Sequence, residues 1–534
     1  MKLDKIWIAK FKNLHDVTID FDESNLTTIL VGWNGAGKSN VIEALVLVFR
    51  NLDLGLPPEF SYELIYRIKG NIVTVKGTKD ESKSITEQYH ISVSPFHGDK
   101  KSESILGISI NKFKRAGGGS YLPNHVFAYY SGSSRRLEDH FQLHQEKFRT
   151  ELLYREEGMG EPIRPFFFAR PVHSQFVLLS FFLGNDRLAR DFLRMRLGIE
   201  DLESVLFVMK SPYWGGSQKH GDKRFWGALG EVSDFLALIY EKALAPHRAK
   251  HRINLGLGVS KGVELLYLFI PDLRSLHDLA EGHGPTAFFK KLESTYISDV
   301  IHEVRIRVKV RDSSASLTFR ELSEGEQQLL VVLGLLRFTG EAESLFLLDE
   351  PDTHLNPSWA VKYLSFLREF VPNRDTSHII LATHNPLAIA ELKKEQVQIM
   401  WRDDSLGKVC ASPPAFDPRG QGFARILTSD MFGLDSTLDE PTQELLRKRR
   451  EISEKMVLSK SEITELKGIN QRLSVLGFQL SSLDPDFEEY LQAKHELLVG
   501  ESKTHDPVTP EQMQSRRDKA KEIVLKLLAE KKRG

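Results

Sequence analysis

A glycine-rich loop between an apolar strand and an apolar helix constrains the fold of this chain more than any other segment. The sequence TTILV is followed by GWNGAGKSN at 32–40 and then by VIEALVLVF. Glycines let backbone N–H groups face one concavity, and a helix N-terminus adds positive potential, so such a loop can hold phosphate. Gly32, Gly37, Lys38 and Ser39 have the spacing of a Walker A loop, which predicts a nucleotide site rather than a chance turn.

The side chains of this loop have separate expected tasks. Lys38 can reach the β- and γ-phosphates and is therefore also a candidate catalytic residue, while Ser39 can bind Mg²⁺. ATP and Mg²⁺ are accordingly the expected cofactors. The candidate nucleotide-binding residues of the loop are Asn34, Gly35, Ala36, Gly37, Lys38, Ser39 and Asn40.

Two acids stand at the end of a short apolar strand. SLFLLDEP places four apolar residues before Asp349 and Glu350. Active sites lie at the carboxyl edge of parallel strands, so Asp349 is expected to hold Mg²⁺ and Glu350 to polarise the attacking water. LATH ends the next strand with His384, a candidate catalytic contact for the γ-phosphate. Taken alone, these residues could be surface positions; the P-loop in the same chain favours the catalytic interpretation.

Strand and helix patterns alternate between 301 and 410, where a helix from Glu324 to Phe338 is followed by SLFLLDE, SWAVKYLSFLREF, SHIILATH and QVQIMW. This alternation predicts an α/β fold with a parallel sheet covered on both faces. The stretch 134–246 is expected to be mostly helical, and 437–475, 484–498 and 509–532 are each expected to be a helix. The expected domains are an ATPase N-lobe (1–95), a mainly helical insertion with some strands (96–300), an ATPase C-lobe (301–420) and a helical tail for oligomer or partner docking (421–534).

The composition excludes several classes of protein. A net charge of -1 over 534 residues leaves only local patches for any contact with nucleic acid. The single cysteine, Cys410, excludes an internal disulfide and a Cys-rich zinc site. No apolar run approaches the roughly 20 residues of a membrane helix, and the N-terminus has no signal-peptide pattern. These features predict a cytoplasmic protein that does not bind membranes.

Together the motifs resemble the ABC-type ATPase head, with GWNGAGKS as Walker A, LSEGE as the signature loop, LFLLDEP as Walker B, DTHLNP as the D-loop and LATH as the histidine switch. The resemblance implies an antiparallel β lobe plus a P-loop parallel sheet with helices, an inserted mainly helical subdomain and a helical C-terminal tail. KFKNL is similar to the RecF, SMC and OLD branch, which implies that Lys12 and Asn13 lie near the nucleotide. The position of the Q-loop glutamine is occupied by FAYYSGSSRR, where Tyr130 and Ser131 are the candidates to replace it.

The signature loop carries the expectation about assembly. In an ABC-type head this loop serves the nucleotide of a second molecule, so the resemblance implies a homodimer or a higher even oligomer. Ser323 would offer its hydroxyl to the γ-phosphate, and Gly325 would allow close backbone approach. Glu326 belongs to the same candidate set, but as an acid it should point away from phosphate, as should Glu324, and stabilise the helix start.

A narrower resemblance concerns function. FAYYSGSSRRLEDHF, SEGEQQLL and the tail segment FGLDSTLDEPTQELLRKRREI are similar to the ATPases of Septu anti-phage systems, including the form found beside some retrons. That family implies a separate HNH nuclease as partner and, in a retron, a reverse transcriptase with its RNA/DNA product. A PARIS-type ATPase with a TOPRIM effector and a RecF-like DNA-repair ATPase stay open as alternatives. No sustained heptads occur between the P-loop and the signature, which excludes a long coiled coil.

Two further features leave alternatives open. Cationic residues are concentrated in two segments, 210–226 and 246–256, and either could contact nucleic acid. In 210–226 the cations alternate with aromatic residues, which also suits a solvated loop that is anchored by tryptophans. The last tail helix carries an apolar stripe, expected to pack within the chain or a dimer, or else to dock a nuclease. The residues of this stripe are Ile523, Val524, Leu527 and Leu528.

Overall fold

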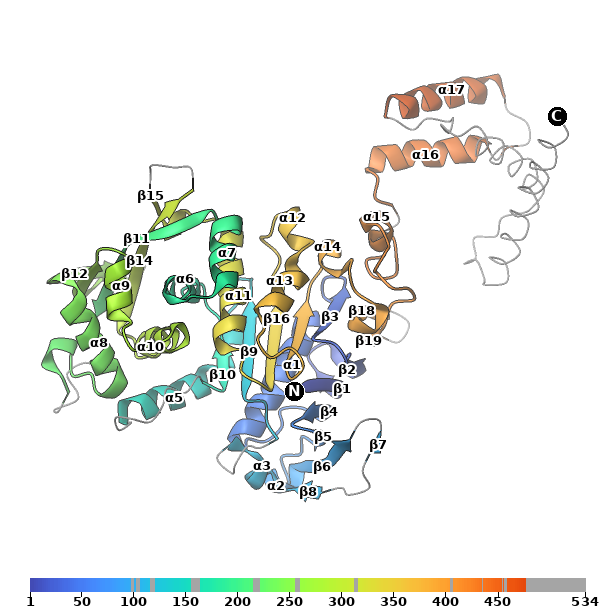
Figure 1. Cartoon of the computed structure of the whole chain (residues 1–534). Coiled ribbons are helices and arrows are strands. Elements are labelled where there is room, and N and C mark those ends of the chain that lie inside the picture. The colour runs from blue at the N-terminus through green and yellow to red at the C-terminus, as the bar shows by residue number, and fades with distance from the viewer. Residues whose placement is uncertain are drawn as a thin grey trace. The chain divides into compact units, whose positions relative to one another are not determined.

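A computed structural model describes residues 1–97, 100–101, 106–115, 121–154, 164–214, 221–254, 260–311, 316–403, 407–434, 436–453, 455 and 459–476. The chain divides into two compact units, Met1–Gly433 and Leu434–Gly534, and each is described by itself. Figure 1 shows the elements in chain order by colour. None of the helices in these ranges is both long and apolar enough to cross a membrane.

The glycine-rich loop belongs to a seven-stranded sheet in the order β10–β9–β16–β17–β3–β18–β19, in which every neighbouring pair is parallel except β18 and β19. Every residue of β3, β16 and β17 is buried, as expected for central strands covered on both faces. The strands are β10 (Phe166–Phe168), β9 (His125–Tyr130), β16 (Ser344–Asp349), β17 (His378–Ala382), β3 (Thr27–Gly32), β18 (Val397–Asp403) and β19 (Lys408–Ser412).

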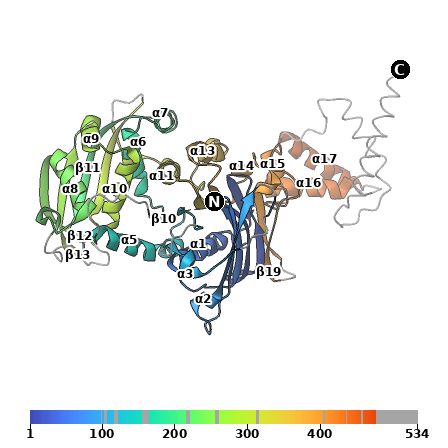
Figure 2. The same ribbon diagram turned by 60° about the horizontal axis from the view of Figure 1, so that its bottom comes forward.

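The N-terminal lobe is a second sheet, antiparallel and in the order β2–β1–β4–β5–β6–β7, with β8 also paired to β6. Helix α1 (Lys38–Leu54) packs its apolar residues against this sheet and against the P-loop sheet in one hydrophobic cluster (Figure 2). The parallel P-loop sheet and the antiparallel lobe together confirm the expected α/β architecture of an ABC-type ATPase head. The lobe strands are β1 (Lys2–Phe11), β2 (Leu14–Asp20), β4 (Tyr62–Ile68), β5 (Asn71–Gly77), β6 (Tyr89–His97), β7 (Lys100–Lys101) and β8 (Leu106–Ile108).

A third sheet, antiparallel and in the order β12–β13–β11–β14–β15, is contacted by α8 (Gly230–Lys242), α9 (Leu273–Leu279) and α10 (Pro285–Ile297). The mostly helical pattern expected over 134–246 did not include its strand β11. Register shifts within that strand leave apolar residues at Ile199, Leu202 and Val205, three apart, which mimics a helix. Its strands are β11 (Ile199–Lys210), β12 (Leu244–Asn254), β13 (Ser260–Ile270), β14 (Ile301–Val310) and β15 (Ser316–Thr318).

The insertion is joined closely to the signature helix, α11 (Glu324–Thr339). Gly334 of α11 lies against α6 (His173–Leu183), where a β-carbon on the glycine would be 2.1 Å from Cγ1 of Val177. β9 and β10 also lie between 96 and 300, although both are strands of the P-loop sheet. The division into four domains therefore stays a prediction. Its boundary between the N-lobe and the insertion assigns two strands of the P-loop sheet, β9 and β10, to the insertion.

The second unit contains a pair of contacting helices, α16 (Glu440–Ser453) and α17 (Lys460–Val475). Among the described residues of this unit, Ile452, Ile469 and Leu473 form a small apolar cluster between the two helices. The single helix expected over 437–475 is thus two helices, with Ser459 capping the second. The helices expected over 484–498 and 509–532, including the apolar stripe at 523–528, lie outside the described residues.

Candidate nucleotide site

The P-loop connects the end of β3 to the start of α1. Gly37 adopts φ +93°, and a β-carbon there would lie 2.8 Å from Leu14, so this position needs glycine. The ammonium group of buried Lys38 donates hydrogen bonds to the carbonyls of Gly32 (2.8 Å) and Trp33 (3.3 Å). Burial lowers the pKa of Lys38, and the nearby Glu350 and Asp349 oppose that shift. The Lys38 ammonium group is thus held across the loop, where the oxygens of a bound phosphate would accept its hydrogen bonds in place of the carbonyls.

The proposed metal side of the loop is formed by Ser39 and Asp349. The Ser39 hydroxyl donates to Oδ1 of Asp349 at 3.1 Å. Burial raises the pKa of Asp349 to about 6, although the Ser39 hydrogen bond lowers it. A buried carboxylate beside a hydroxyl is an oxygen donor set that suits Mg²⁺, and a divalent cation would offset the burial of the charge. The residues present therefore fit the expected metal.

The end of β16 positions Glu350 with an unusual backbone. Glu350 has φ +52°, a left-handed conformation that is rare for a residue with a side chain. Its N–H donates to the carbonyl of Ala382 at 2.8 Å, which fixes the turn to the neighbouring strand. One carboxylate oxygen of Glu350 lies 3.1 Å from Nδ1 of His384. The two catalytic candidates are therefore brought together at the carboxyl edge of the sheet, beside the P-loop.

Lys12 and Asn13, in the turn between β1 and β2, make different contacts. The Asn13 amide donates to the carbonyl of Gly35 at 2.8 Å and accepts from the Asn40 side chain at 2.6 Å, so Asn13 touches the P-loop directly. The Lys12 ammonium group instead binds both carboxylate oxygens of Glu43, at 2.6 and 2.5 Å. Only Asn13 is placed against the loop itself in this structure.

The signature loop is built as a capped helix start. Ser323 is the N-cap of α11, and Oε2 of Glu326 accepts hydrogen bonds from its N–H and its hydroxyl, both at 2.7 Å. Gly325 approaches the D-loop of the same chain, where a β-carbon would lie 2.5 Å from the carbonyl oxygen of His354. Among the described residues, no hydrogen bond or ion pair of Ser323 or Glu326 reaches the P-loop of the same chain.

A buried carboxylate that the sequence analysis did not single out organises one flank of the site. Glu43, in the second turn of α1, is contacted by Lys12, by Nε2 of His140 at 2.9 Å and by Nε of Arg136 at 3.3 Å. Burial disfavours its charge, but hydrogen bonds from His140 and Lys12 leave the pKa of Glu43 below its ordinary value. The sequence signals available were an acid one turn beyond Ser39 and the paired arginines after YYSGSS.

The second residue of the P-loop, Trp33, faces outward, with 66% of its surface exposed. Its indole N–H donates to the carbonyl of Phe432 at 2.9 Å. The next residue, Gly433, has φ +64°, and a β-carbon there would be 3.2 Å from the Trp33 ring. The nucleotide loop is therefore bonded to the last residues of the first unit.

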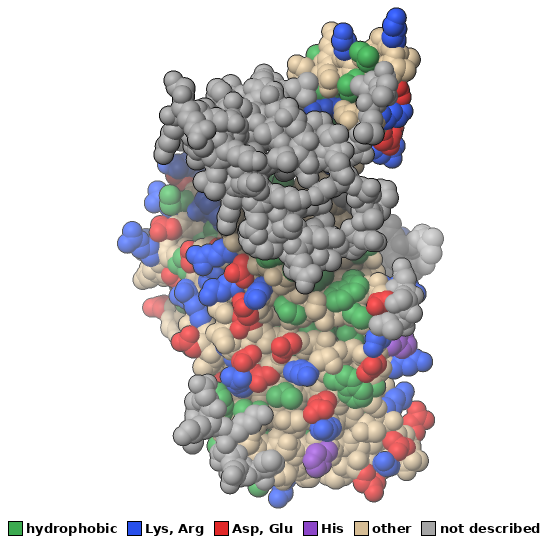
Figure 3. Space-filling model, turned by 90° about the vertical axis from the view of Figure 1, so that its right-hand side faces the viewer, with side chains coloured by type: hydrophobic (Ala, Val, Ile, Leu, Met, Phe, Trp, Pro, Cys, Tyr) green, Lys and Arg blue, Asp and Glu red, His purple; other side chains and the backbone are tan. Residues whose placement is uncertain are grey.

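The loop 210–226 places most of its aromatic side chains as anchors. Trp214 donates its indole N–H to the carbonyl of Ser298 at 2.8 Å, Trp226 donates to Glu264 at 2.6 Å, and Phe225 is fully buried. Lys219 lies outside the described residues. Figure 3 views another face, the right-hand side of Figure 1, where acidic and basic side chains are intermixed among the described residues. These contacts favour the interpretation that the described parts of this stretch, 211–214 and 221–226, are anchored to the insertion.

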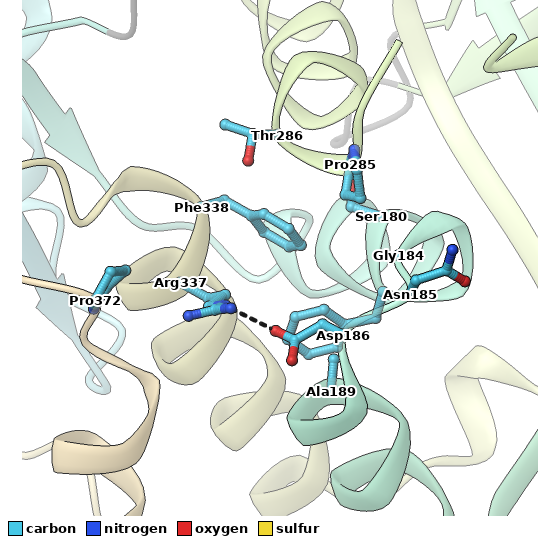
Figure 4. Close-up of a pocket in the computed structure, with 11 residues that line it drawn as sticks. Ser180, Gly184, Asn185, Asp186, Ala189, Pro285, Thr286, Arg337, Phe338 and Pro372 are labelled. Carbon is cyan, nitrogen blue, oxygen red and sulfur yellow. Dashed lines mark ion pairs between the residues drawn. The ribbon is translucent and has the colours of Figure 1, made fainter. Parts of the chain in front are cut away.

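A cavity of about 440 Å³ lies away from the candidate nucleotide site, between the helices of the insertion and α11. It includes apolar residues such as Phe181 and Phe338, and an ion pair of 2.8 Å joins Asp186 to Arg337 at its wall (Figure 4). None of the candidate nucleotide residues lines it. The cavity marks the seam between insertion and signature helix.

Two sequence families match parts of the chain. The family described as "AAA ATPase domain" matches residues 1–140, and the family described as "AAA domain, putative AbiEii toxin, Type IV TA system" matches residues 250–390. The first match contains the P-loop. The second contains the signature loop, the acidic end of β16 and His384.

Two curated proteins are similar over shorter stretches. Septu protein PtuA of Bacillus mycoides (strain KBAB4) is 25% identical over 165 residues, which is 28% of this chain and 22% of that protein. The "Retron Vc95 probable ATPase" of Vibrio cholerae serotype O1 biovar El Tor is 26% identical over 164 residues, 28% of this chain and 30% of that protein. The match thus spans less than a third of either relative.

Solved structures of SMC heads resemble the chain weakly. The SMC head domain from Thermotoga maritima gives a TM-score of 0.31 at 14% identity, covering 77% of this chain and 99% of that one. An SmcHead bound to the C-winged helix domain of ScpA gives 0.33 at 11% identity, with 77% and 98% covered. The fold assignment rests on the strand order above and not on these values. The two family matches, the motifs and the low-identity similarity to PtuA support an AAA ATPase that resembles the SMC and RecF branch and is similar to Septu protein PtuA.

Proposed function

We propose that this chain binds ATP with Mg²⁺, hydrolyses it to ADP and phosphate, and acts as the ATPase subunit of an anti-phage defence system. The observation that carries the proposal is that two pairs of side chains lie at the same edge of the P-loop sheet. Ser39 and Asp349 are 3.1 Å apart on one side, and Glu350 and His384 are 3.1 Å apart on the other. Both pairs flank the P-loop with Lys38, as hydrolysis of a bound nucleotide would require.

Each residue has a defined task in this proposal. Lys38 and the P-loop N–H groups hold the β- and γ-phosphates. Mg²⁺, when held by Ser39 and Asp349, neutralises phosphate charge. Glu350 orients a water molecule and accepts its proton as the water oxygen bonds to the γ-phosphorus and the bond to the bridging oxygen breaks, releasing ADP and phosphate. His384 orients the Glu350 carboxylate and contacts the γ-phosphate.

The active unit would be a head-to-head dimer or a higher even oligomer. Ser323 and Gly325 lie at the start of α11, with the hydroxyl held by Glu326 rather than by any group of the same P-loop. A second copy would bring its P-loop to this helix N-terminus, where the dipole favours a phosphate. Two composite sites would then form across the interface. In that arrangement Glu326 keeps its cap position and does not bind nucleotide.

The biological setting is inferred from the relatives. Similarity to Septu protein PtuA and to a retron ATPase supports a role in anti-phage defence. We further propose that the chain controls a separate HNH nuclease, with the helices beyond Leu434 as the docking region. A reverse transcriptase and its RNA/DNA product would be additional partners in a retron. Co-expression with candidate HNH and TOPRIM proteins, followed by co-purification, separates a Septu-type from a PARIS-type system.

The central experiment combines two variants with a control. Lys38→Ala should weaken ATP binding at least about tenfold, because it removes a charged phosphate contact. Glu350→Gln should slow phosphate release by about 10²-fold or more while ATP affinity is retained, since the amide cannot accept the proton. Lys5→Ala, at an exposed lysine of β1, is the control and should match wild type. Wild-type hydrolysis rates in both site variants would show the assignment to be wrong.

A further inference from the structure

The segment after β9 is tied to the end of the Walker B strand. Ser131 donates its N–H to the carbonyl of Asp349 at 3.3 Å, and its hydroxyl lies 3.2 Å from that of Thr353. Tyr130 folds back on its own loop, since a β-carbon on Gly132 would lie 2.2 Å from the tyrosine hydroxyl. Neither candidate replacement for the Q-loop glutamine presents a charge or an amide to the nucleotide.

The same segment does bring a cation to the site. Arg136, at the start of α4 (Arg136–Asp139), donates from Nη1 to the side-chain oxygen of Asn40 at 3.2 Å. Its Nε lies 3.3 Å from Glu43. Asn40 directly follows Ser39, and the charge of Arg136 also stabilises the ionised form of Asp349. The guanidinium therefore lies next to Asn40, on the side of the P-loop where Ser39 and Asp349 form the expected metal site.

Arg136 is held less firmly than its neighbours. Its side chain is 41% exposed, whereas that of Glu43 is 4% exposed. Glu43 has two closer partners, Lys12 and His140, which would stay if Arg136 left. Removing one exposed partner from a carboxylate that keeps two others avoids the penalty of a buried, unpaired charge. A stronger anion near Asn40 could therefore draw the guanidinium away.

We propose that Arg136 turns from Glu43 to the γ-phosphate of ATP held by the P-loop of its own chain, since the segment after β9 offers no Q-loop glutamine. This rests on the proposed function of the same site. A guanidinium binds phosphate oxygens through two parallel hydrogen bonds and stabilises the charge that develops during phosphoryl transfer. Because ADP has no γ-phosphate, Arg136 distinguishes the two nucleotides. When ATP is bound, the lost ion pair between Arg136 and Glu43 changes the contacts of α1, which carries Glu43, and of the β1–β2 turn, which carries Lys12.

The test compares ATP with ADP. Binding of a non-hydrolysable ATP analogue and of ADP is measured by calorimetry, and hydrolysis by phosphate release, in wild type, Arg136→Gln, Arg136→Lys and Arg135→Gln. The last is the matched control, because Arg135 is 71% exposed and contacts only Glu138, at 3.4 Å, among its ion-pair partners in the described chain. Arg136→Gln should lose about tenfold in analogue affinity and at least about tenfold in hydrolysis, with ADP affinity within about twofold.

Arg136→Lys should recover part of both losses, since it restores the charge without the paired geometry. Arg135→Gln should match wild type. Equal losses for ATP analogue and ADP in Arg136→Gln, or no loss for either, would overturn this inference while leaving the proposed ATPase intact. A wild-type protein that binds neither nucleotide would overturn the proposed function, and the inference with it.

Discussion

Gly325 lies so close to His354 that a β-carbon on the glycine would be 2.5 Å from the histidine carbonyl oxygen. The same two loops are joined twice more, because the His354 N–H donates to Oε1 of Gln328 and its Nδ1 lies 3.3 Å from Glu324. The signature loop, which is expected to face a second molecule, and the D-loop thus form one surface within the chain. The sequence analysis predicted that glycine is needed at position 325 for close approach to a phosphate bound by a second molecule. The structure adds a second reason for glycine, which is the close contact with the D-loop of the same chain.

Gly325→Ala should separate the two loops, because the added methyl group would lie 2.5 Å from the carbonyl oxygen of His354, closer than packed atoms approach. We expect ATP binding to persist, since the P-loop is untouched, and hydrolysis to fall at least about tenfold, since a misplacement of about 1 Å can cost about 10²-fold. Nucleotide affinity and phosphate release measure the two effects. Gly262→Ala is the control, because open space surrounds that position. Hydrolysis unchanged in both variants would contradict the joined surface.

Ser323→Arg places a long cation at the helix start expected to receive a second molecule's γ-phosphate. The variant should bind ATP as wild type does and yet lose hydrolysis and ATP-dependent assembly, because the block lies outside its own P-loop. Light scattering with ATP in a Glu350→Gln background measures assembly. A variant that remains fully active as a monomer would refute the composite site.

Gly334→Ala tests the seam between α6 and α11. The added methyl group meets Val177 at 2.1 Å, so the helices must move apart and the free energy of unfolding should fall by about 1–3 kcal/mol. Val177→Ala in the same chain removes the opposing methyl groups and should make the double variant more stable than the two single effects predict. Urea unfolding of the four proteins gives the coupling. If the changes in unfolding free energy of the two single variants added up to that of the double variant, the contact between Gly334 and Val177 would not limit the packing of α6 against α11.

His378 gives a pH dependence of stability. The buried ring accepts the Leu3 N–H at Nδ1 (2.9 Å) and lies 3.0 Å from the Thr28 hydroxyl at Nε2. Burial lowers its pKa well below the ordinary value of 6.5, with Lys2 and the N-terminus adding to the shift. Below pH 6.5 the unfolded state binds a proton that the folded state excludes, so stability must fall on acidification until the folded pKa is reached.

The measurement compares wild type with His378→Asn, which keeps a polar side chain but cannot titrate. The difference in unfolding free energy between the two proteins should shrink as pH falls from 7 to 5, by up to about 1.4 kcal/mol per pH unit for one proton. Parallel pH profiles would show that the ring titrates alike in both states. The raised pKa of Asp4, about 6 through burial, acts in the opposite direction but is common to both proteins.

The fold of the ATP-binding half follows from local patterns. TTILV, SLFLL and HIILA each contain a run of three or four apolar residues, and such runs are typical of strands in a parallel sheet that is buried on both faces. Their loops then share one edge, which is why Lys38, Asp349 and His384 could be grouped from sequence. Strand β11 could not be recognised in this way, because its register shifts break the period-two pattern.

The contacts of Glu43 could not be predicted from the sequence for a different reason. Its partners come from the β1–β2 turn and from α4, and the His140 contact spans 97 residues of sequence. No spacing rule links such segments, and only the folded chain brings their charges together. Asn13 and Lys12 illustrate the same limit: they are neighbours in sequence, yet one contacts the P-loop and the other contacts Glu43.

The hydrogen bond from Trp33 to Phe432 fixes where this protein can be divided. A chain ending before Phe432 would lose the acceptor and leave an exposed indole beside the nucleotide loop, whereas a chain ending after Gly433 would keep it. Truncation at the end of the sheet, near Ser412, would therefore yield a protein with an altered P-loop. The last residues of the first unit therefore belong with the P-loop, even though the chain has already left its sheet.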